Sequence, residues 1–556
     1  MGLFKIIPSQ GVKDKSQAVT PSETEEPDVV TTVIGNYGRW QLLMTFLLSL
    51  FSLPCTFHIY LPTFTAAVKK FWCKRPDNLS SLPVDVWIKY SQPSDACTVR
   101  QLPDNITADI ILNGTSTIID AFQKCTEWEY DMSEVGYTII SEWNLVCDRE
   151  YLTSLTDSMF LIGVGAGGVV GGWISDKFGR KKVLMSMMIA QSSLAILSLL
   201  VRSFIQYLLV RLVMGFVSVS VVYAAFVLSV ELVGGKWVTI AGVCNFFWLP
   251  LAYIVVSLLS LLMPNWRDLQ LSLSVPGCAL LVLWFVLPES PRWLMSMGKT
   301  QEAKIILEKA AKFNKQEIPA DIDKLLMLCK TDSQEEGPSV KMIFQGALRK
   351  RTICLFITWF SMTIAYYGLL LNIGNFGLGN LHVTSIILAS VELPAIAISI
   401  PILLKAGRRI PIFISMSMCG LACVASELLS MVFDEEWIMI ACLMLGKFAI
   451  GSTNMMLPIF TVELYPTVVR NLGVGASQLA SGLALAIIPY LWKLAIFNKH
   501  VPMMMLAGLA VLGGAIVLIL PETAKPQESQ VTKNRKQTMD SSTRQDTFTI
   551  TDDRGH

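Results

Sequence analysis

Apolar runs of membrane-spanning length constrain this chain more than any other feature. A helix needs ~20 apolar residues to cross ~30 Å of hydrocarbon, and only 16% of the residues are charged, against about 25% in a soluble chain. We therefore predict an all-α membrane protein with twelve transmembrane helices in two halves of six. The predicted spans are 40–64, 152–175, 183–201, 204–232, 239–263, 267–287, 352–373, 380–404, 409–432, 436–461, 471–494 and 499–520.

Longer polar segments divide these spans into a domain plan. The segment between the halves contains an amphipathic helical pattern over Lys299–Lys315, with apolar residues on one face and Lys and Glu opposite, which predicts short intracellular helices. Both ends of the chain are polar and are predicted to be disordered cytoplasmic tails. The predicted units are 1–39 (tail), 40–64 (first helix), 65–150 (extracellular loop), 151–288 (helices 2–6), 289–351 (intracellular helical loop), 352–520 (helices 7–12) and 521–556 (tail).

The loop at 65–150 combines an even number of cysteines with three glycosylation sequons. This combination between two spans is typical of an oxidising, extracellular compartment. It predicts two disulfides, whose pairing stays open among three options. The cysteines are Cys73, Cys97, Cys125 and Cys147, and the sequons begin at Asn78, Asn105 and Asn113.

Cations beside the spans indicate the orientation. Short cytoplasmic loops collect Lys and Arg, and three such clusters, at 181–182, 349–351 and 408–409, fall on one side of the predicted topology. Both termini are then cytoplasmic in a multi-pass protein, which we expect in the plasma membrane.

Charged motifs recur at matched positions in the two halves, which predicts an internal duplication. The turn around Asp176–Lys182 is echoed at Lys405–Arg409, and Pro288–Arg292 after the sixth span is echoed at Pro521–Thr523 after the twelfth. Such duplication is typical of transporters whose halves rock about a site at mid-membrane. We expect the motif charges to form ion pairs that close the cytoplasmic side and break on opening; the alternative is solvated loop ends. The gate residues are Asp176, Gly179, Arg180, Glu231, Glu289, Arg292, Gly407, Arg408, Glu463 and Arg470.

Taken together, these motifs resemble the major facilitator superfamily and, more narrowly, the organic cation, carnitine and anion transporters of solute carrier family 22. The resemblance extends from about Trp40 to Thr523 and is carried by four stretches in particular. These are Glu142-Trp143-Asn144-Leu145-Val146-Cys147, Asp176-Lys177-Phe178-Gly179-Arg180-Lys181, Pro288-Glu289-Ser290-Pro291-Arg292-Trp293-Leu294, and Glu463-Leu464-Tyr465-Pro466-Thr467 with Arg470-Asn471-Leu472-Gly473.

Polar and aromatic residues at mid-membrane are the candidates for a substrate site. Trp359 and Tyr366 are seven residues apart and share a helix face, and aromatic faces attract organic cations by ~0.5–2 kcal/mol each; the alternative is packing. Glu392 is an ionisable group inside an apolar span, which is a functional candidate by default. The resemblance implies binding-site aromatics here and implies a role for Glu392 in substrate binding or coupling. The structural alternative for Glu392 is an ion pair with Lys447, at a position where the resemblance implies an Arg or Lys, and both roles can hold at once. Further candidates are Tyr367, Phe226, Ser477 and Gln478.

Helix 11 departs from the family pattern. The resemblance implies an Asp there in cation carriers and an Arg in anion and carnitine carriers, but the matching residue is Gly482. One carboxylate, one amine and several aromatics suit a cation or zwitterion better than a dianion. An organic-anion carrier and a transport-dead receptor on the same fold stay open as alternatives.

The sequence offers no support for enzymatic or nucleotide-driven function. Four scattered histidines and the cysteine spacing provide no metal-ligand motif, and we expect no cofactor, no catalytic residue and no metal. No phosphate-binding loop of the Gly-x-x-x-x-Gly-Lys-Ser/Thr type is present, and a net charge of +2 does not indicate nucleic acid. The expected partners are a small organic ion and the lipid bilayer, with any coupling ion unknown.

Overall fold

The structure is a computed structural model. It describes residues 29–67, 70–92, 96–102, 106–112, 121–131, 136–235, 237–319, 322, 340–371, 381–433, 436–465 and 469–523.

The architecture is a bundle of long apolar helices, which confirms the all-α membrane fold. Within the described residues, eleven helical stretches are long and apolar enough to cross a membrane, and α21 is apolar but shorter. The helices of the bundle are α2 (Arg39–Ser49), α3 (Ser52–Thr65), α7 (Tyr151–Phe178), α8 (Arg180–Leu197), α9 (Phe204–Glu231), α10 (Trp237–Cys244), α11 (Trp248–Leu262), α12 (Trp266–Leu280), α16 (Gly346–Leu371), α17 (Leu381–Lys405), α18 (Arg409–Ser430), α19 (Glu436–Leu464), α20 (Arg470–Leu491) and α21 (Val501–Val517).

Short elements connect or extend these helices. Two pairs of bundle helices, α2 with α3 and α10 with α11, each form one span. The remaining helices are α1 (Val29–Ile34), α4 (Val84–Ser91), α5 (Ala108–Leu112), α6 (Ile139–Trp143), α13 (Pro291–Ser296) and α14 (Thr300–Asn314), and the 3₁₀ segments are 77–79, 147–149, 198–200, 245–247, 281–285, 340–344 and 492–496.

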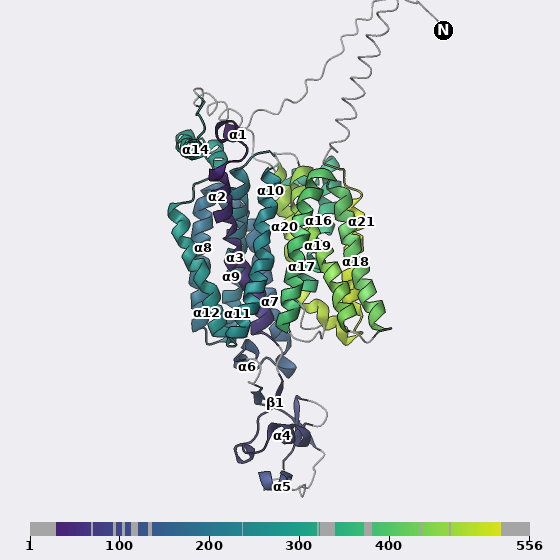
Figure 1. Cartoon of the computed structure of the whole chain (residues 1–556). Helices are drawn as coiled ribbons and strands as arrows, with labels where there is room; N and C mark the ends of the chain where they lie inside the picture. The colour runs from purple at the N-terminus through teal and green to yellow at the C-terminus, as the bar shows by residue number, and fades with distance from the viewer. Residues whose placement is uncertain are drawn as a thin grey trace, which may run out of the picture.

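The bundle consists of two halves that lie side by side (Figure 1). The first half contains α2, α3 and α7 to α12, and the second contains α16 to α21. The main contacts between them run from α7 to α20 and from α11 to α17. We call the end of the bundle beside α4 to α6 the loop face, and the opposite end, beside α13 and α14, the α14 face (Figure 1).

Glycines allow α7 to pack tightly within its own half. A Cβ atom added at Gly163 or Gly167 would lie 2.1 or 2.3 Å from a backbone carbonyl oxygen of α9. Small residues of this kind let helix backbones approach closely where lipid provides no hydrophobic drive for association. These positions therefore fix α7 against α9.

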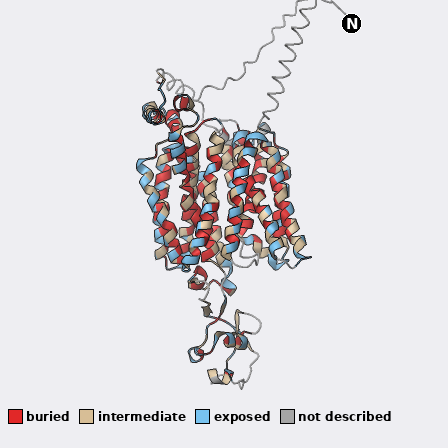
Figure 2. Ribbon diagram, in the orientation of Figure 1, coloured by how far each residue is buried: buried red, intermediate tan, exposed pale blue. Residues whose placement is uncertain are grey.

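Buried residues lie along the facing sides of the helices, and exposed residues lie on the outward sides (Figure 2). Many of the exposed residues are large and apolar, among them Leu262, Phe285 and Leu421. Contiguous apolar exposure over a whole bundle is expected for a surface that faces lipid rather than water.

The loop between α3 and α7 forms a small unit at the loop face. Strand β1 (Phe71–Cys73) pairs antiparallel with β4 (Trp128–Tyr130), and β2 (Thr98–Arg100) pairs with β3 (Phe122–Lys124). Trp72, Leu79 and Trp87 belong to its own buried cluster.

Two disulfides and one ion pair anchor this unit. Cys73 pairs with Cys125 and Cys97 with Cys147, which selects one of the three predicted pairings. Glu142 accepts two hydrogen bonds of 2.6 Å from Arg267 on α12, which fixes α6 to the bundle. Asn78 is exposed, whereas Asn105 and Asn113 lie outside the described residues.

The α14 face contains the predicted intracellular helix and one element that was not predicted. Helix α14 buries Ala303, Leu307 and Ala310, as its amphipathic pattern indicates. It packs against α1, whose valines and isoleucine are buried. The prediction of a disordered tail through residue 39 is therefore wrong from Val29 onward, because the apolar residues of α1 have a partner in α14. Residues 1–28 and 524–556 lie outside the described residues.

Candidate functional site

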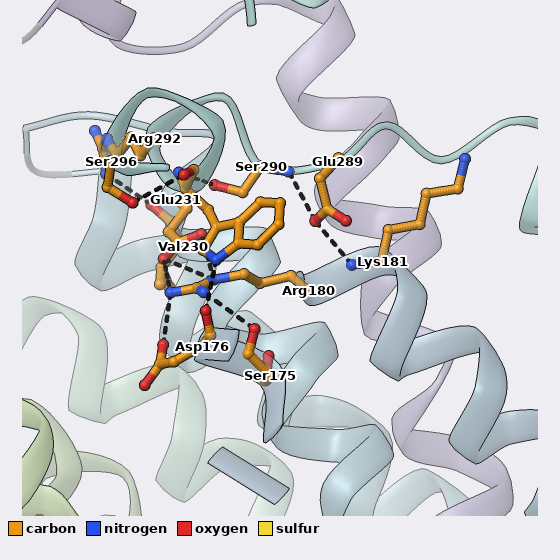
Figure 3. Close-up of polar contacts among 11 residues, drawn as sticks. Ser175, Asp176, Arg180, Lys181, Val230, Glu231, Glu289, Ser290, Arg292 and Ser296 are labelled. Atoms are coloured by element: carbon orange, nitrogen blue, oxygen red, sulfur yellow. Dashed lines mark hydrogen bonds and ion pairs between the residues drawn. The ribbon is translucent and has the colours of Figure 1, made fainter. Parts of the chain in front are cut away.

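A hydrogen-bonded latch joins three helix ends of the first half at the α14 face (Figure 3). The guanidinium of Arg180 lies 2.8 Å from Asp176 Oδ1 and 3.1 Å from Glu231 Oε1. Glu289 accepts from the backbone N–H of Lys181 at 2.9 Å. Arg292 donates to the carbonyl of Val233 at 2.9 Å. The latch therefore ties α7, α8 and α9 to the segment that leads into α13.

The second half contains a corresponding latch, with an arginine–glutamate pair and a second glutamate that accepts from backbone N–H groups. Arg408 donates to Glu463 Oε1 at 3.0 Å, and Glu522 accepts from the backbone N–H groups of Arg408 and Arg409 at 2.9 and 3.1 Å. The sequence echo at Pro521–Thr523 pointed to Glu522, although it was not among the predicted gate residues. The Asp176 position is occupied by Leu404, four residues before Arg408, so this half has one carboxylate fewer.

Both latches depend on a glycine in a left-handed conformation. Gly179 has φ +103° and Gly407 has φ +84°, a region that glycine adopts without steric cost. A Cβ at Gly179 would lie 2.7 Å from Glu289 Oε2, and one at Gly407 would lie 3.1 Å from the Glu522 carboxyl carbon. The glycines therefore turn the chain and leave room for the carboxylate.

The described ion pairs of the latches lie within one half each. Arg180 and Glu231 both belong to the first half, and Arg408 and Glu463 both belong to the second. The predicted residues therefore do form ion pairs, each within one half. That these pairs close the cytoplasmic side and break on opening stays a prediction. They fix helix ends inside each half, which makes each half more rigid. The side chain of Arg470 lies outside the described residues.

A buried charged group forms the centre of the second half. Lys447 Nζ on α19 lies 3.7 Å from Glu392 Oε2 on α17, and these side chains are 0% and 1% exposed. Tyr366 on α16 donates a 2.5 Å hydrogen bond to Glu392 Oε1, and Lys447 Nζ lies 3.4 Å from the centroid of the Tyr366 ring. The structure thus brings together the three residues for which the sequence argument was sharpest.

The two buried charges of this group are incompletely hydrogen-bonded, which favours replacement of one partner by a substrate. At 3.7 Å the Glu392–Lys447 contact is longer than a hydrogen bond, and Lys447 Nζ is buried with no hydrogen-bond partner in the described structure. A buried charge that is paired but incompletely hydrogen-bonded is costly to keep. A substrate that supplied a better partner to either charge would therefore be favoured.

The structure separates the other two predicted aromatic residues. Trp359 is buried and donates its Nε1–H to Thr461 Oγ1 at 2.9 Å, which joins α16 to α19. Tyr367 is half-buried, and its ring meets that of Tyr366 edge-on with centroids 5.0 Å apart. Tyr367 therefore extends the aromatic surface of the charged group, whereas Trp359 connects two helices of the second half.

The three remaining predicted residues differ in their contacts: one bonds within its own helix, one bonds across the boundary between the halves, and one packs within the first half. Ser477 donates to the carbonyl of Gly473 in its own helix at 3.0 Å. Gln478 accepts a hydrogen bond from Tyr223 on α9, across the boundary. Phe226 lies in the first half, with its ring centroid 6.1 Å from that of Phe246.

The absence of a side chain at Gly482 has a direct steric reason. A Cβ at Gly482 would lie 2.7 Å from the Cα of Gly165 on α7, and the reverse holds for Gly165. This is a backbone-to-backbone crossing of α7 and α20, so no charged side chain fits here in this conformation. The sequence showed the glycine but not the close approach.

Sequence reasoning missed two tyrosines, Tyr60 on α3 and Tyr253 on α11. Tyr60 on α3 lies within electrostatic range of Glu392, and its ring stacks on Tyr253 with centroids 4.2 Å apart. Tyr253 donates to Ser385 on α17 at 3.3 Å. Repeated aromatic residues in apolar spans were the signal, but periodicity does not say which of them face the other half.

Two helical halves with duplicated latches and a buried charged group between helices define a membrane transporter of the major facilitator class. A family model described as sugar (and other) transporter matches residues 109–531. An organic cation transporter protein from Drosophila melanogaster is 31% identical over 512 residues, covering 89% of this chain and 92% of that protein. Organic cation/carnitine transporter 2 from Rattus norvegicus is 33% identical over 520 residues, covering 89% and 91%.

Solved structures give the same fold. The xylose transporter XylE from E. coli, in a partially occluded inward open conformation, matches with a TM-score of 0.60 at 16% identity, covering 87% of this chain and 99% of that one. Solute carrier family 22 member 4 from Mus musculus is 33% identical over 521 residues, covering 89% of this chain and 92% of that protein. The family model and these relatives show that the chain belongs to the sugar (and other) transporter family of the major facilitator superfamily and, within it, to solute carrier family 22. It is a multi-pass membrane protein of a transporter family.

Proposed function

We propose that this protein carries small organic cations or zwitterions, of the carnitine or amine type, across the plasma membrane by alternating access. The observation that carries the proposal is the position of Lys447 Nζ, 3.4 Å from the Tyr366 ring centroid and 3.7 Å from Glu392 Oε2. This amine occupies the place that the ammonium group of a substrate would take, because both groups seek a carboxylate and an aromatic face.

The same geometry favours a zwitterion. A substrate ammonium that displaces Lys447 from Glu392 leaves the amine free to bind a carboxylate of the same substrate. The site has one buried carboxylate and one buried amine, so a zwitterion satisfies both charges and a simple cation satisfies one. Carnitine has a quaternary ammonium and a carboxylate, and relatives of this chain are organic cation/carnitine transporters.

The orientation follows from the cations beside the spans. Lys181 and Lys182 lie at the start of α8, and Arg349 to Arg351 lie near the start of α16. Short cytoplasmic loops collect such residues, so we assign the α14 face to the cytoplasm and the disulfide-bonded unit to the outside. Exposed Asn78 is then in the compartment where glycosylation occurs. Both termini lie in the cytoplasm, and transport involves no chemical step.

Uptake by cells that express the full chain tests the proposal. Labelled carnitine, tetraethylammonium and an aromatic monoanion are compared, with Glu392→Gln as the site variant and Ser390→Ala as the control. Ser390 lies on the same helix, is exposed and donates only to its own helix at Ile386. We expect saturable carnitine uptake that is lost in Glu392→Gln and kept in Ser390→Ala.

Two outcomes would contradict the proposal. Saturable uptake of the anion alone would assign the site to organic anions, with Lys447 as the main binding residue. Ligand-induced thermal stabilisation without flux of any substrate in proteoliposomes would indicate a receptor on the same fold.

A further inference from the structure

A second group of ionisable residues lies in the first half, away from the site described above. It consists of His58 on α3, Asp157 on α7, and Tyr207 and Arg211 on α9. His58, Tyr207 and Arg211 are 2%, 3% and 4% exposed, and Asp157 is half-buried with its Oδ1 atom buried. Asp157 is six residues from the start of α7, Arg211 seven from the start of α9 and His58 seven from the end of α3. At 1.5 Å rise per residue, all three lie about 10 Å below the loop face.

Three members of this group, Asp157, His58 and Arg211, each have a buried polar atom without a hydrogen-bond partner among the described residues. Arg211 Nη1 donates to the carbonyl of His58 at 3.0 Å, and its guanidinium carbon lies 4.3 Å from the centroid of the Phe160 ring. Asp157 Oδ1, His58 Nδ1 and Arg211 Nε are buried and have no hydrogen-bond partner in the described part of the chain.

Asp157 interacts electrostatically with Arg211 but forms no direct ion pair with it. The two groups interact electrostatically, yet no Asp157–Arg211 contact within 4.0 Å occurs among the ion pairs of the described residues. Tyr207 is the other titratable group within electrostatic range of Asp157, and His58 interacts with Arg211. Helices α8 and α20, which also pack against α7, bring no charged group to Asp157 within the described structure.

We propose that Asp157 is a proton-binding site and that its proton is transported together with the substrate. An ionisable residue inside a span marks an ion or proton pathway by default, and here a carboxylate oxygen is buried and unpartnered. One proton bonds to Oδ1 from the solvent on one side and leaves to the solvent on the other. Between these two steps the positive charge of Arg211 stabilises the deprotonated carboxylate electrostatically, and this attraction is lost when the proton binds.

A proton fits this site better than a metal cation. Hard cations need several oxygen ligands, and no group of three His, Cys, Asp or Glu residues suited to a metal occurs in the described structure. The permanent charge of Arg211 opposes the binding of any cation, but a proton forms a covalent bond to one carboxylate oxygen and needs no further ligands.

This inference rests on the proposed function. Proton coupling supplies the driving force that the membrane potential does not give to a zwitterion. A membrane potential of 100 mV is worth ~2.3 kcal/mol per charge, but a zwitterion has no net charge and gains nothing from it. Its accumulation therefore needs a coupled ion. For one proton per substrate, a difference of one pH unit changes the steady-state accumulation ratio about tenfold.

Proteoliposomes with the purified full chain test the inference, with labelled carnitine as the probe and the membrane potential clamped. We expect the accumulation ratio of wild type to change about tenfold per pH unit of imposed gradient and that of Asp157→Asn to remain unchanged. Asp268→Asn is the control, because Asp268 is exposed and its carboxylate accepts only from Asn265 at 3.1 Å. It should behave as wild type. Carnitine counterflow in wild type without any effect of the pH gradient would overturn the inference and leave the proposed function standing.

A readout that does not depend on transport separates the two proposals. Infrared difference spectra between acid and alkaline pH should contain a carboxylic acid C=O band that Asp157→Asn removes and Asp268→Asn retains. The same band in Asp157→Asn would overturn the proton site whether or not carnitine is transported. Absence of carnitine counterflow, with this band present, would overturn the proposed substrate instead.

Discussion

The Glu392–Lys447 pair gives the sharpest test of the central group, because each single substitution leaves a buried charge without its partner. At 3.7 Å and an effective dielectric constant of about 20, the attraction between two unit charges is about 4 kcal/mol. Removing one partner of a buried pair costs about 3–5 kcal/mol, whereas replacing both by neutral residues is often neutral or stabilising. The free energy of unfolding should therefore change non-additively.

The assay is a double-mutant cycle on thermal unfolding in detergent, with Glu392→Gln, Lys447→Met and the double variant. If each half unfolds as a domain of 150–250 residues, 1 kcal/mol corresponds to about 2–4 °C, so a loss of about 4 kcal/mol lowers the melting temperature by roughly 8–16 °C. Lys447→Met should cost less than Glu392→Gln, because Tyr366 still donates to the remaining carboxylate. The double variant should regain most of the loss.

A purely additive result would refute this reasoning. If the double variant melts below both single variants, Glu392 and Lys447 contribute independently and the pair is not coupled. If both single variants have the melting temperature of wild type, both charges are solvated in the folded protein, which would contradict their burial in the structure.

Three further predictions concern the latches, the crossing of the halves and the loop unit. Glu463→Gln should destabilise the protein by about 1.5–3 kcal/mol. Glu231→Gln should cost less, because Arg180 keeps its ion pair with Asp176. Equal losses in melting temperature for the two variants would contradict this difference between the latches. Gly482→Ala should cost about 1–3 kcal/mol through overpacking and slow uptake, whereas Gly475→Ala on the same helix, where a Cβ meets nothing within 4 Å, should match wild type in both assays. Cys97→Ser removes the disulfide to Cys147, which joins residues 50 apart, and should lower the free energy of unfolding by about 2–5 kcal/mol. Maleimide labelling and peptide mapping should then find one new free thiol in the disulfide-bonded unit, at Cys147. Labelling of another cysteine there would refute the pairing.

The sequence predicts most of the fold, because each span depends on a local pattern of length and apolarity. The span predicted at 380–404 is α17 at Leu381–Lys405, and the span predicted at 204–232 is α9 at Phe204–Glu231. The amphipathic pattern over Lys299–Lys315 likewise predicts α14 within one residue at each end. These elements needed no knowledge of their neighbours.

The features that sequence reasoning missed all depend on which elements meet. Disulfide pairing is a property of the folded loop, so four cysteines alone left three options open. Helix α1 is too short to be stable by itself and exists because α14 offers it an apolar face. The reason for glycine at 482 is the α7–α20 crossing, which no pattern within α20 reveals. In the central group, by contrast, Glu392 and Lys447 stood out because charge in an apolar span is conspicuous.

Polar contacts within the halves and contacts between the halves respond differently to a motion that separates them. At the loop face, His382 on α17 joins the halves: its ring stacks on Phe64 with centroids 5.3 Å apart, and its Nδ1 lies 2.9 Å from Ser260 Oγ. The latch ion pairs at the α14 face hold each half together instead. A rocking motion that separates the halves at the α14 face leaves these pairs intact, whereas one that separates them at the loop face must break the His382 contacts. The duplicated latches therefore provide the rigidity of the moving bodies, and resistance to opening at the loop face arises from side chains of α3, α11 and α17.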